Sequence, residues 1–369
     1  MQEHDDPPLP HVRIRSRCHS HVTPGPVMTC SLPLHLLAML PADATVCIGL
    51  PIDRAAHGAC LIAGAFLAIT HHHEHGGVPV RALWHDDHRS ADGGRAAANH
   101  LRDQGIRYVI GHFSSRAAMT AAPVYADAGI LFLAPGASAP ELTDLPVPSS
   151  VLRLFGRDGT QADAITRALH HLGPAQQIEL FIEDNRYGRS LGALLTARLT
   201  DAGHIVRPVV VHRGDAPDPT MDGPAILAGT REFSARLLQR LAPSRYRIAG
   251  DDAFHTAFLE EAGAMADGVR IPVIGGHADN AAAARLTEAY RVLIGRAPGA
   301  YFLTSYVAID LVLRTLRHCG DCGGSTAAAW LRARSWPTAL GELGFSATGE
   351  VSGLDWRMVR VHRQQFVPT

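Results

Sequence analysis

The sequence predicts an α/β protein built from two doubly wound parallel sheets. The chain has 369 residues, of which 46% are hydrophobic and 19% are charged, so it can form two domains with sizeable cores. From residue 45 onward, short apolar segments alternate with amphipathic segments of helical spacing. The alternation restarts near residue 177. This alternation of strands and helices is typical of βαβ units, whose parallel sheets are covered by helices on both faces.

The first unit is expected to contain four strands and three intervening helices. The segment 45–50 carries no charged residue, as expected for a strand that is buried on both faces. The expected strands are 45–50, 80–84, 107–111 and 130–133, and the expected helices are 58–70, 92–105 and 115–128. Gly76 and Gly77 are expected to stop the first helix after a His-rich run, because glycine favours helix ends.

The second unit repeats this pattern and then continues into a long helical region. Its expected strands are 177–182, 205–211, 225–227 and 245–249, and its expected helices are 188–202, 232–241, 253–262 and the region 281–316. Between 211 and 225 the sequence indicates a turn and no helix. A parallel connection needs about a dozen residues or more, so the sequence leaves the local topology there open.

Composition and charge exclude several classes of function. The formal net charge is −1, so no global basic field exists to hold nucleic acid or anionic lipid. All 34 basic residues are arginine, which rules out a phosphate-loop lysine, a lysine Schiff base and a Ser–Lys dyad. Six cysteines are too few for a disulfide scaffold in a chain of this length. The sequence has no run of about 18 apolar residues, so no membrane span is expected.

The first 44 residues suggest either a disordered extension or a weak export signal. Residues 1–26 are polar and rich in Pro and His, a composition typical of disorder. The apolar stretch 27–40 is followed by Ala42-Asp43-Ala44, with arginines upstream, which resembles a secretory signal peptide. A mobile extension, or a start site misplaced upstream of Met28, explains the same pattern.

Two loops at expected strand ends are candidates for ligand binding, because ligands of open parallel sheets bind beyond the carboxyl ends of the strands. After 107–111, Ser114 and Ser115 precede a helix whose free N–H groups and dipole favour a carboxylate. Either serine can also cap that helix, and capping is compatible with ligand binding. After 130–133, a loop of small residues around Ser138 adds backbone donors to the same cleft.

These loops and several later segments resemble the leucine/isoleucine/valine-binding protein family. This family comprises the type I periplasmic solute-binding proteins of branched-chain amino acid ABC transporters. The similarity is carried first by Gly-His-Phe-Ser-Ser at 111–115 and by the segments 122–130 and 135–143. It continues in order through Arg153, 157–161, the Asp-Asn-Arg-Tyr-Gly motif at 184–188, 250–254, 262–269 and 301–310. The resemblance extends from about residue 45 to residue 367.

The resemblance implies a two-lobed type I periplasmic-binding-protein fold with a three-stranded hinge, in which the lobes close on a ligand like a clamp. Residues 45–154 and 281–337 would form the first lobe, and 155–280 and 338–369 the second. By resemblance, the hydroxyls of Ser115 and Ser138 and the backbone around Gly136 and Ala137 would hold an α-carboxylate.

Three further residues receive roles by the same resemblance. Asp252 would meet the α-ammonium of an amino acid, Phe113 would line the side-chain pocket, and Tyr187 would face the cleft from the second lobe. Asp251 is expected to cap the helix that begins near residue 253.

The chain also departs from the family pattern at three positions. His57 stands where the family has an aromatic residue, and Thr230 or Arg231 falls where the second lobe is expected to supply another. Ser114 replaces a cysteine that forms a disulfide in some members. Because of these differences, the resemblance alone does not fix the ligand.

Three other groups of residues could bind a metal or react, but we interpret them as structural. The His-rich run 71–75 lies at a helix end away from the cleft, which favours a solvated surface run over a metal site. Cys319 and Cys322 form a Cys-x-x-Cys spacing without a second pair, which indicates a turn or, after export, a local disulfide. The cluster 84–88 contains acids that the family carries without a metal.

The sequence therefore predicts a non-enzymatic solute-binding protein of an ABC transporter, without cofactor, metal or nucleic acid. Its ligand would be a small amino acid of the branched-chain type or an amide, and its partner a membrane permease. Its location would be the periplasm or the cell surface. One alternative is a cytoplasmic amide or amino-acid sensor on the same fold. Another is an enzyme that uses His57 as a general base.

Overall fold

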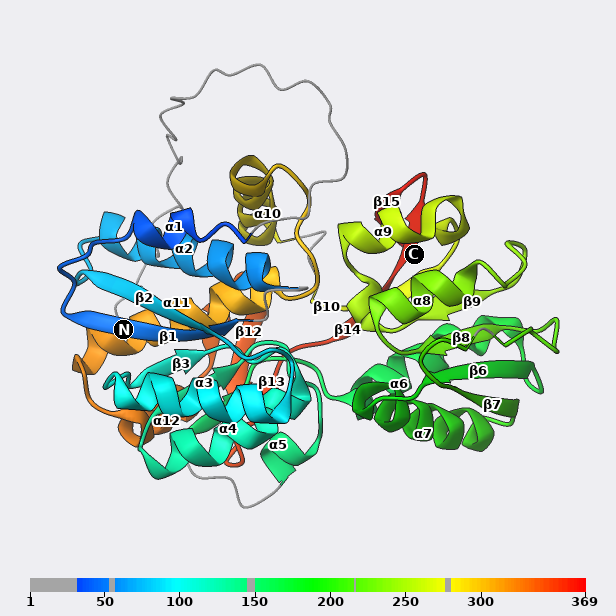
Figure 1. Ribbon diagram of the computed structural model, residues 1–369, viewed down its shortest axis with the longest axis horizontal. Helices are drawn as coiled ribbons and strands as arrows, with labels where there is room; N and C mark the ends of the chain where they lie inside the picture. Colours follow the sequence, from blue (N-terminus) through cyan, green and yellow to red (C-terminus); the bar gives the residue numbers. More distant parts are fainter. Residues whose placement is uncertain (1–31, 53–56, 145–149, 216, 276–279) are drawn as a thin grey trace, which may run out of the picture.

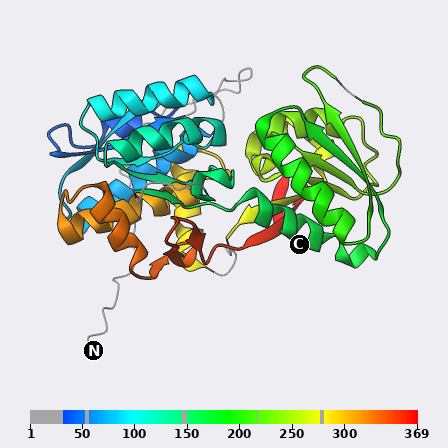
Figure 2. The ribbon, with the colours of Figure 1, turned by 90° about the horizontal axis from the view of Figure 1, so that it is seen from below.

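The computed structural model describes residues 32–52, 57–144, 150–215, 217–275 and 280–369. Two α/β lobes lie side by side, and each contains a sheet with helices on both faces (Figures 1 and 2). The predicted fold class is therefore confirmed. The first lobe is formed mainly by the N-terminal half of the chain and by the helices near residue 300.

The first lobe is organised around a five-stranded, fully parallel sheet in the order β2-β1-β3-β4-β5. Its strands are β1 (Val46–Ile52), β2 (Val80–Asp86), β3 (Tyr108–Ile110), β4 (Leu131–Ala134) and β5 (Val151–Arg153). Alternate side chains face opposite layers: Tyr108 and Ile110 belong to one hydrophobic cluster and Val109 to another. The sheet thus has a hydrophobic cluster on each face, as the uncharged segment of β1 predicts.

The helices of the first lobe form two layers. On one face α2 (Gly58–Glu74) packs against α11 (Phe302–Cys319), and on the other α3 (Ala91–Asp103) packs against α4 (Ser115–Asp127). Shorter or peripheral helices complete the lobe: α1 (His35–Ala38), α5 (Glu141–Asp144), α10 (Ala281–Ile294) and α12 (Gly324–Arg332). The predicted helical region 281–316 is two helices, because Gly295 ends α10 in a left-handed conformation and Pro298 follows it.

The second lobe contains a seven-stranded mixed sheet in the order β15-β14-β10-β9-β8-β6-β7. The parallel strands are β6 (Gln177–Glu183), β7 (Ile205–Val211), β8 (Ala225–Ala228), β9 (Arg247–Ala249) and β10 (Arg270–Ile274). Strand β14 (Trp356–His362) pairs antiparallel with β10, and β15 (Gln365–Pro368) pairs antiparallel with β14. Helices α6 (Asp158–Ala168) and α7 (Arg186–Asp201) cover one face, and α8 (Arg231–Leu238) and α9 (Thr256–Ala262) cover the other.

The connection from β7 to β8 keeps the parallel topology that the sequence left open. Both strands pair in parallel with β6, so the connection crosses β6, and residues 212–215 and 217–224 form no helix. A buried carboxylate anchors this connection: Glu179 accepts hydrogen bonds of 3.0 Å from both the N–H and the hydroxyl of Thr220. Arg207 and Arg245 pair with the same carboxylate, so its charge is compensated.

The chain crosses between the lobes after β5, after β10 and before β14, in agreement with the predicted number of crossings. A small antiparallel sheet of β11 (Trp336–Thr338), β12 (Gly341–Phe345) and β13 (Val351–Ser352) precedes the last crossing. Leu343 and Phe345 pack in the core of the first lobe. The predicted lobe limits stay a prediction, and this packing favours a last limit near β14.

The His-rich run is not the solvated surface run that the sequence suggested. Helix α2 continues through it to Glu74, and His71 and His72 are buried. His71 shares a hydrogen bond of 2.9 Å with the Tyr306 hydroxyl, and His72 accepts one of 3.0 Å from Arg317. Among the described residues, no group of His, Cys, Asp and Glu side chains is arranged to hold a metal ion.

The remaining motifs have structural roles. Cys319 and Cys322 form a disulfide after α11, one of the two outcomes expected from their spacing. Of the extension, residues 1–31 lie outside the described ranges, whereas Leu36 and Leu40 are buried in the first-lobe core. The described helices include none that is long and apolar enough to cross a membrane.

Candidate functional site

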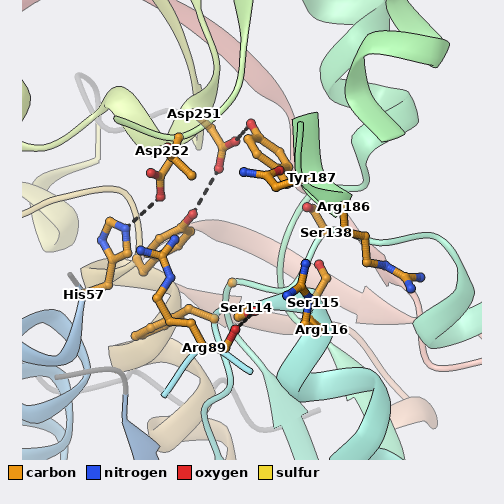
Figure 3. A pocket seen from close by; sticks show the side chains of 15 residues that line it. His57, Arg89, Ser114, Ser115, Arg116, Ser138, Arg186, Tyr187, Asp251 and Asp252 are labelled. Carbon is orange, nitrogen blue, oxygen red and sulfur yellow. Dashed lines mark hydrogen bonds and ion pairs between the residues drawn. The ribbon is translucent and has the colours of Figure 1, made fainter. Parts of the chain in front are cut away.

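A cavity of about 260 Å³ lies between the lobes, at the carboxyl ends of the parallel strands of both sheets (Figure 3). The loops after β1, β2, β3 and β4 line it from the first lobe, and those after β6, β8 and β9 line it from the second. Its walls are formed by His57, Arg89, Phe113, Ser114, Ser115, Arg116, Gly136, Ser138, Asn185, Arg186, Tyr187, Thr230, Asp251, Asp252 and Tyr301. Eight of the nine predicted site residues therefore meet here, and Ala137 is buried behind the wall.

The first-lobe wall presents the N-terminus of α4. Ser114 is the N-cap residue, and its side chain makes no capping hydrogen bond: its hydroxyl lines the cavity and donates a long hydrogen bond of 3.5 Å to the Arg89 carbonyl. The Ser115 hydroxyl oxygen accepts a hydrogen bond of 3.1 Å from the Ala139 N–H. A hydroxyl that accepts in this way keeps its own hydrogen for a second partner. The wall thus offers free donors at a helix N-terminus, where a negative charge is favoured.

The loop with Gly136 and Ser138 is held in place by a fully buried arginine. Arg153 donates hydrogen bonds of 3.0 Å to the Ala137 carbonyl and 2.7 Å to the Ala139 carbonyl. A Cβ at residue 136 would lie 2.5 Å from the ring of Phe113, so the close contact of loop and ring requires Gly136. The Phe113 ring stacks on Tyr301, with ring centroids 4.8 Å apart, and this pair forms an aromatic wall of the cavity.

Asp251 is a member of a hydrogen-bonded network and does not cap a helix, so the sequence prediction for it was wrong. Its carboxylate accepts hydrogen bonds from the Tyr187 hydroxyl at 2.6 Å and the Gln161 amide at 2.7 Å, with the Tyr301 hydroxyl at 3.4 Å. Burial, aided by the charge of the adjacent Asp252, raises the pKa of Asp251 to about 6. The hydrogen bond from Tyr187 opposes that rise.

Asp252 pairs with His57 across the cleft. The distance from its Oδ1 to His57 Nε2 is 2.8 Å (Figure 3). Its Oδ2 accepts a 2.8 Å hydrogen bond from the Arg231 N–H. Both side chains are buried. Burial opposes ionisation, but the charge and hydrogen bond of His57 outweigh it and hold the pKa of Asp252 far below its usual range. The predicted ammonium-binding carboxylate thus already has a partner from the opposite lobe.

Three arginines line the cavity and had no predicted role. Arg89 and Arg116 belong to the first lobe, and Arg186 belongs to the second, where it pairs with Glu141 of the first lobe at 3.2 Å. Arg89 lies in the loop after β2, and Arg116 and Arg186 lie in the first turns of α4 and α7, the helices that follow β3 and β6. Applying the strand-end rule to every such loop, and not only to those with family motifs, identifies all three.

Asn185, Thr230 and Tyr301 complete the wall. Asn185 caps α7 through a 2.8 Å hydrogen bond from the Gly188 N–H, and Thr230 caps α8. Thr230 also donates from its N–H and hydroxyl to Glu183, so it is a small polar replacement for the aromatic residue that the family resemblance led us to expect. Tyr301 lies at the start of α11, in a segment that the family motif had already indicated.

Comparisons with known proteins agree with this architecture. A sequence model of the family described as periplasmic binding protein matches residues 53–228. The leucine-, isoleucine-, valine-, threonine- and alanine-binding protein of Pseudomonas aeruginosa is 24% identical over 339 residues, which cover 84% of this chain and 87% of that protein.

Solved structures show the same fold. A branched-chain amino acid transporter substrate-binding protein of Streptococcus pneumoniae, in complex with isoleucine, gives a TM-score of 0.78 at 17% identity, covering 87% of this chain and 97% of that chain. A solute-binding protein of an ABC transporter from R. palustris, in complex with benzoate, gives a TM-score of 0.73 at 14% identity. The match covers 88% of this chain and 95% of that chain.

The fold and the interlobe cavity define a two-lobed solute-binding protein. This chain is similar in sequence to leucine/isoleucine/valine-binding proteins over 84% of its length, which confirms the family resemblance seen in its sequence. These relatives are named as binding proteins, in agreement with the prediction of a non-enzymatic solute-binding protein.

Proposed function

We propose that this chain is the solute-binding component of an ABC transporter of the branched-chain amino acid type, and that it closes on a small carboxylate-bearing solute. The observation that carries this proposal is the convergence of strand-end loops from both sheets on one polar cavity. The ligands named for its relatives are amino acids or benzoate, and all of them carry a carboxylate.

The first-lobe loops are suited to hold that carboxylate. The hydroxyls of Ser114, Ser115 and Ser138 and the free N–H groups at the start of α4 would donate to its oxygens. Phe113 would contact the apolar part of the solute, and Tyr187 would close the cavity from the second lobe.

The two lobes form a hinged clamp in this proposal. The pairs His57–Asp252 and Arg186–Glu141 join the lobes across the cleft, and three chain crossings connect them on the hinge side. A solute that contacts both walls stabilises the closed form, because binding shifts the population toward the state with more contacts. A membrane permease would recognise this closed form.

A periplasmic or cell-surface location fits the family and the Cys319–Cys322 disulfide, since disulfides persist in oxidising compartments. A cytoplasmic sensor is the second candidate, because Leu36 and Leu40 lie buried in the first-lobe core, upstream of the signal-like Ala42-Asp43-Ala44. Mass spectrometry of the mature N-terminus in the native host distinguishes them. Processing near Ala44 supports the transporter component, and an intact chain supports the sensor.

A thermal-shift screen of amino acids, amides and small carboxylic acids tests solute binding itself. A ligand that binds only the folded protein raises the melting temperature with its concentration. Small-angle scattering of the same samples should show a smaller radius of gyration with the ligand, if the clamp closes. A full screen without a shift at millimolar concentrations contradicts the proposed function.

A further inference from the structure

Among the described residues that line the cavity, neither of the two carboxylates is free to bind an ammonium group. Asp252 is occupied at both oxygens, by His57 at Oδ1 and by the Arg231 N–H at Oδ2, each at 2.8 Å. The His57 ring lies edge-on to Tyr301, with centroids 4.5 Å apart, and edge-on to His255 at 5.4 Å, so it is packed in this position. To reach Asp252, an ammonium would have to displace a buried imidazole.

The second acid of the cavity is occupied as well. Asp251 accepts hydrogen bonds from Tyr187, Gln161 and Tyr301, and these donors come from three different helices or their first turns. An ammonium that took over this carboxylate would leave the buried Tyr187 hydroxyl without its closest acceptor. A buried polar group that loses its partner carries the full desolvation penalty, which opposes such an exchange.

The rest of the lining favours an anion. Arg89, Arg116 and Arg186 surround the cavity, and the donors of Ser114 and Ser115 lie at the N-terminus of a helix of 13 residues. The two aspartates are balanced within the protein by His57 and by neutral donors. A bound carboxylate would therefore meet arginine side chains and the donors of a helix N-terminus, without needing an ammonium of its own.

The aromatic wall suits an apolar body next to that carboxylate. Phe113 and Tyr301 stack with an interplanar angle of 17°, and His57 contributes the edge of a third ring. A branched aliphatic chain or an aromatic ring packs well on such a surface. The cavity volume of about 260 Å³ restricts the solute to a small molecule.

We infer that the solute of this protein is a small carboxylate without an α-ammonium group, and that His57 determines this preference by occupying Asp252. The inference rests on the proposed function and narrows its solute class. The imidazole takes the place that the ammonium of an amino acid would take, so a deaminated analogue leaves the His57–Asp252 pair intact.

Matched pairs of probes test the inference on the full-length protein. Calorimetry should compare 4-methylpentanoate with leucine and 3-phenylpropanoate with phenylalanine, because each pair differs only in the α-ammonium group. We expect the better carboxylate to bind at least ten-fold more tightly than its amino acid. Tighter binding of either amino acid than of its analogue overturns the inference and leaves the proposed function intact. Binding of no probe overturns both.

Variants at His57 test its role in the preference. His57→Phe frees Asp252, so the ratio of amino acid to carboxylate affinity should rise at least ten-fold. The double variant His57→Phe/Asp252→Asn lacks the acceptor and should lose that gain. His57→Ala also removes the donor to Asp252, and it replaces His57→Phe in the test if that variant does not fold. An unchanged ratio in the folded single variant rules out His57 as the determinant.

Discussion

Two buried histidine–aspartate pairs at the strand ends of the first lobe have the same length but join different parts of the molecule. His112 and Asp87 both belong to the first lobe, and their Nδ1–Oδ2 distance is 2.8 Å. His57 and Asp252 also lie 2.8 Å apart, but Asp252 belongs to the second lobe. Burial alone therefore does not distinguish a pair that supports the fold from one that spans a cleft.

The surroundings of the two pairs make the distinction. The second nitrogen of His112 bonds the Tyr125 hydroxyl at 2.9 Å, so that imidazole is fully satisfied within its lobe. The Nδ1 of His57 is buried without a hydrogen-bond partner among the described residues, although its Nε2 is paired. Opening the lobes would separate His57 from Asp252 and return both to water, whereas no rigid lobe motion separates His112 from Asp87.

The largest expected effect is on the pair within the lobe. Asp87→Ala should lower the free energy of unfolding by about 3–5 kcal/mol at pH 7, because His112 would be left buried without its partner. Chemical denaturation measures this loss. Asp103→Ala is the control: its ion pair with Arg102 is exposed, so its loss should cost about 1 kcal/mol or less. Equal losses in both variants would show that the Asp87 pair is not a structural one.

The same pair sets a dependence on pH. Burial opposes the ionisation of Asp87, but the hydrogen bond and charge of His112 outweigh it and lower the pKa of Asp87 below 3.8. A carboxylate with a depressed folded pKa contributes stability above its unfolded pKa, and that contribution is lost as the pH falls. The difference in the free energy of unfolding between wild type and Asp87→Ala should therefore become smaller below about pH 4.

Asp251 should affect the pH dependence of stability in the opposite direction to Asp87. Burial raises its pKa from 3.8 to about 6, so the folded protein favours the protonated acid and loses stability as the pH rises from about 4 to 7. Asp251→Asn cannot ionise, and it should be more stable than wild type by up to about 3 kcal/mol at pH 8 and similar to it at pH 4. Urea denaturation at both pH values measures the difference. An equal difference in the free energy of unfolding at pH 4 and at pH 8 would contradict the raised pKa of Asp251.

The serine hydroxyls should affect binding rather than folding. Ser115→Ala and Ser138→Ala should each weaken binding of the best carboxylate from the screen by about 1–3 kcal/mol, the usual loss for a hydrogen bond to a charged group. Calorimetry on the folded variants measures this, with the exposed Ser352→Ala as a control. Unchanged affinity would remove these serines from the proposed site.

The smallest effect on stability is expected for the pair that spans the cleft. His57→Ala should change the free energy of unfolding by about 1 kcal/mol or less, because opening the lobes exposes Asp252 to water. The same variant should have a larger radius of gyration in small-angle scattering without ligand. A stability loss as large as that of Asp87→Ala would remove the contrast between the two pairs.

Much of the fold and part of the site could be predicted from local patterns. The uncharged strand β1 and the amphipathic helix α3 can be recognised from the pattern of apolar residues in their own segments. This pattern does not depend on which other segments they contact in the fold. Ser115 and Ser138 were found because they follow strands, and parallel strands bring their carboxyl ends to one edge. The β7–β8 topology could not be predicted, because the distant Glu179 anchors its connection.

The sequence by itself determined the parallel strands of both sheets, the family resemblance and the loops that meet at the cleft, because each depends on spacing or motifs within short segments. The antiparallel strand β14 of the second sheet was not predicted. Only the tertiary structure decided that His71 and His72 are buried and that Asp251 belongs to a hydrogen-bonded network. It also decided the partner of Asp252, which lies 195 positions away in the sequence. The physical reason is that a side chain's charge balance depends on its neighbours in space, and a hinge between two lobes brings together residues that no local pattern connects.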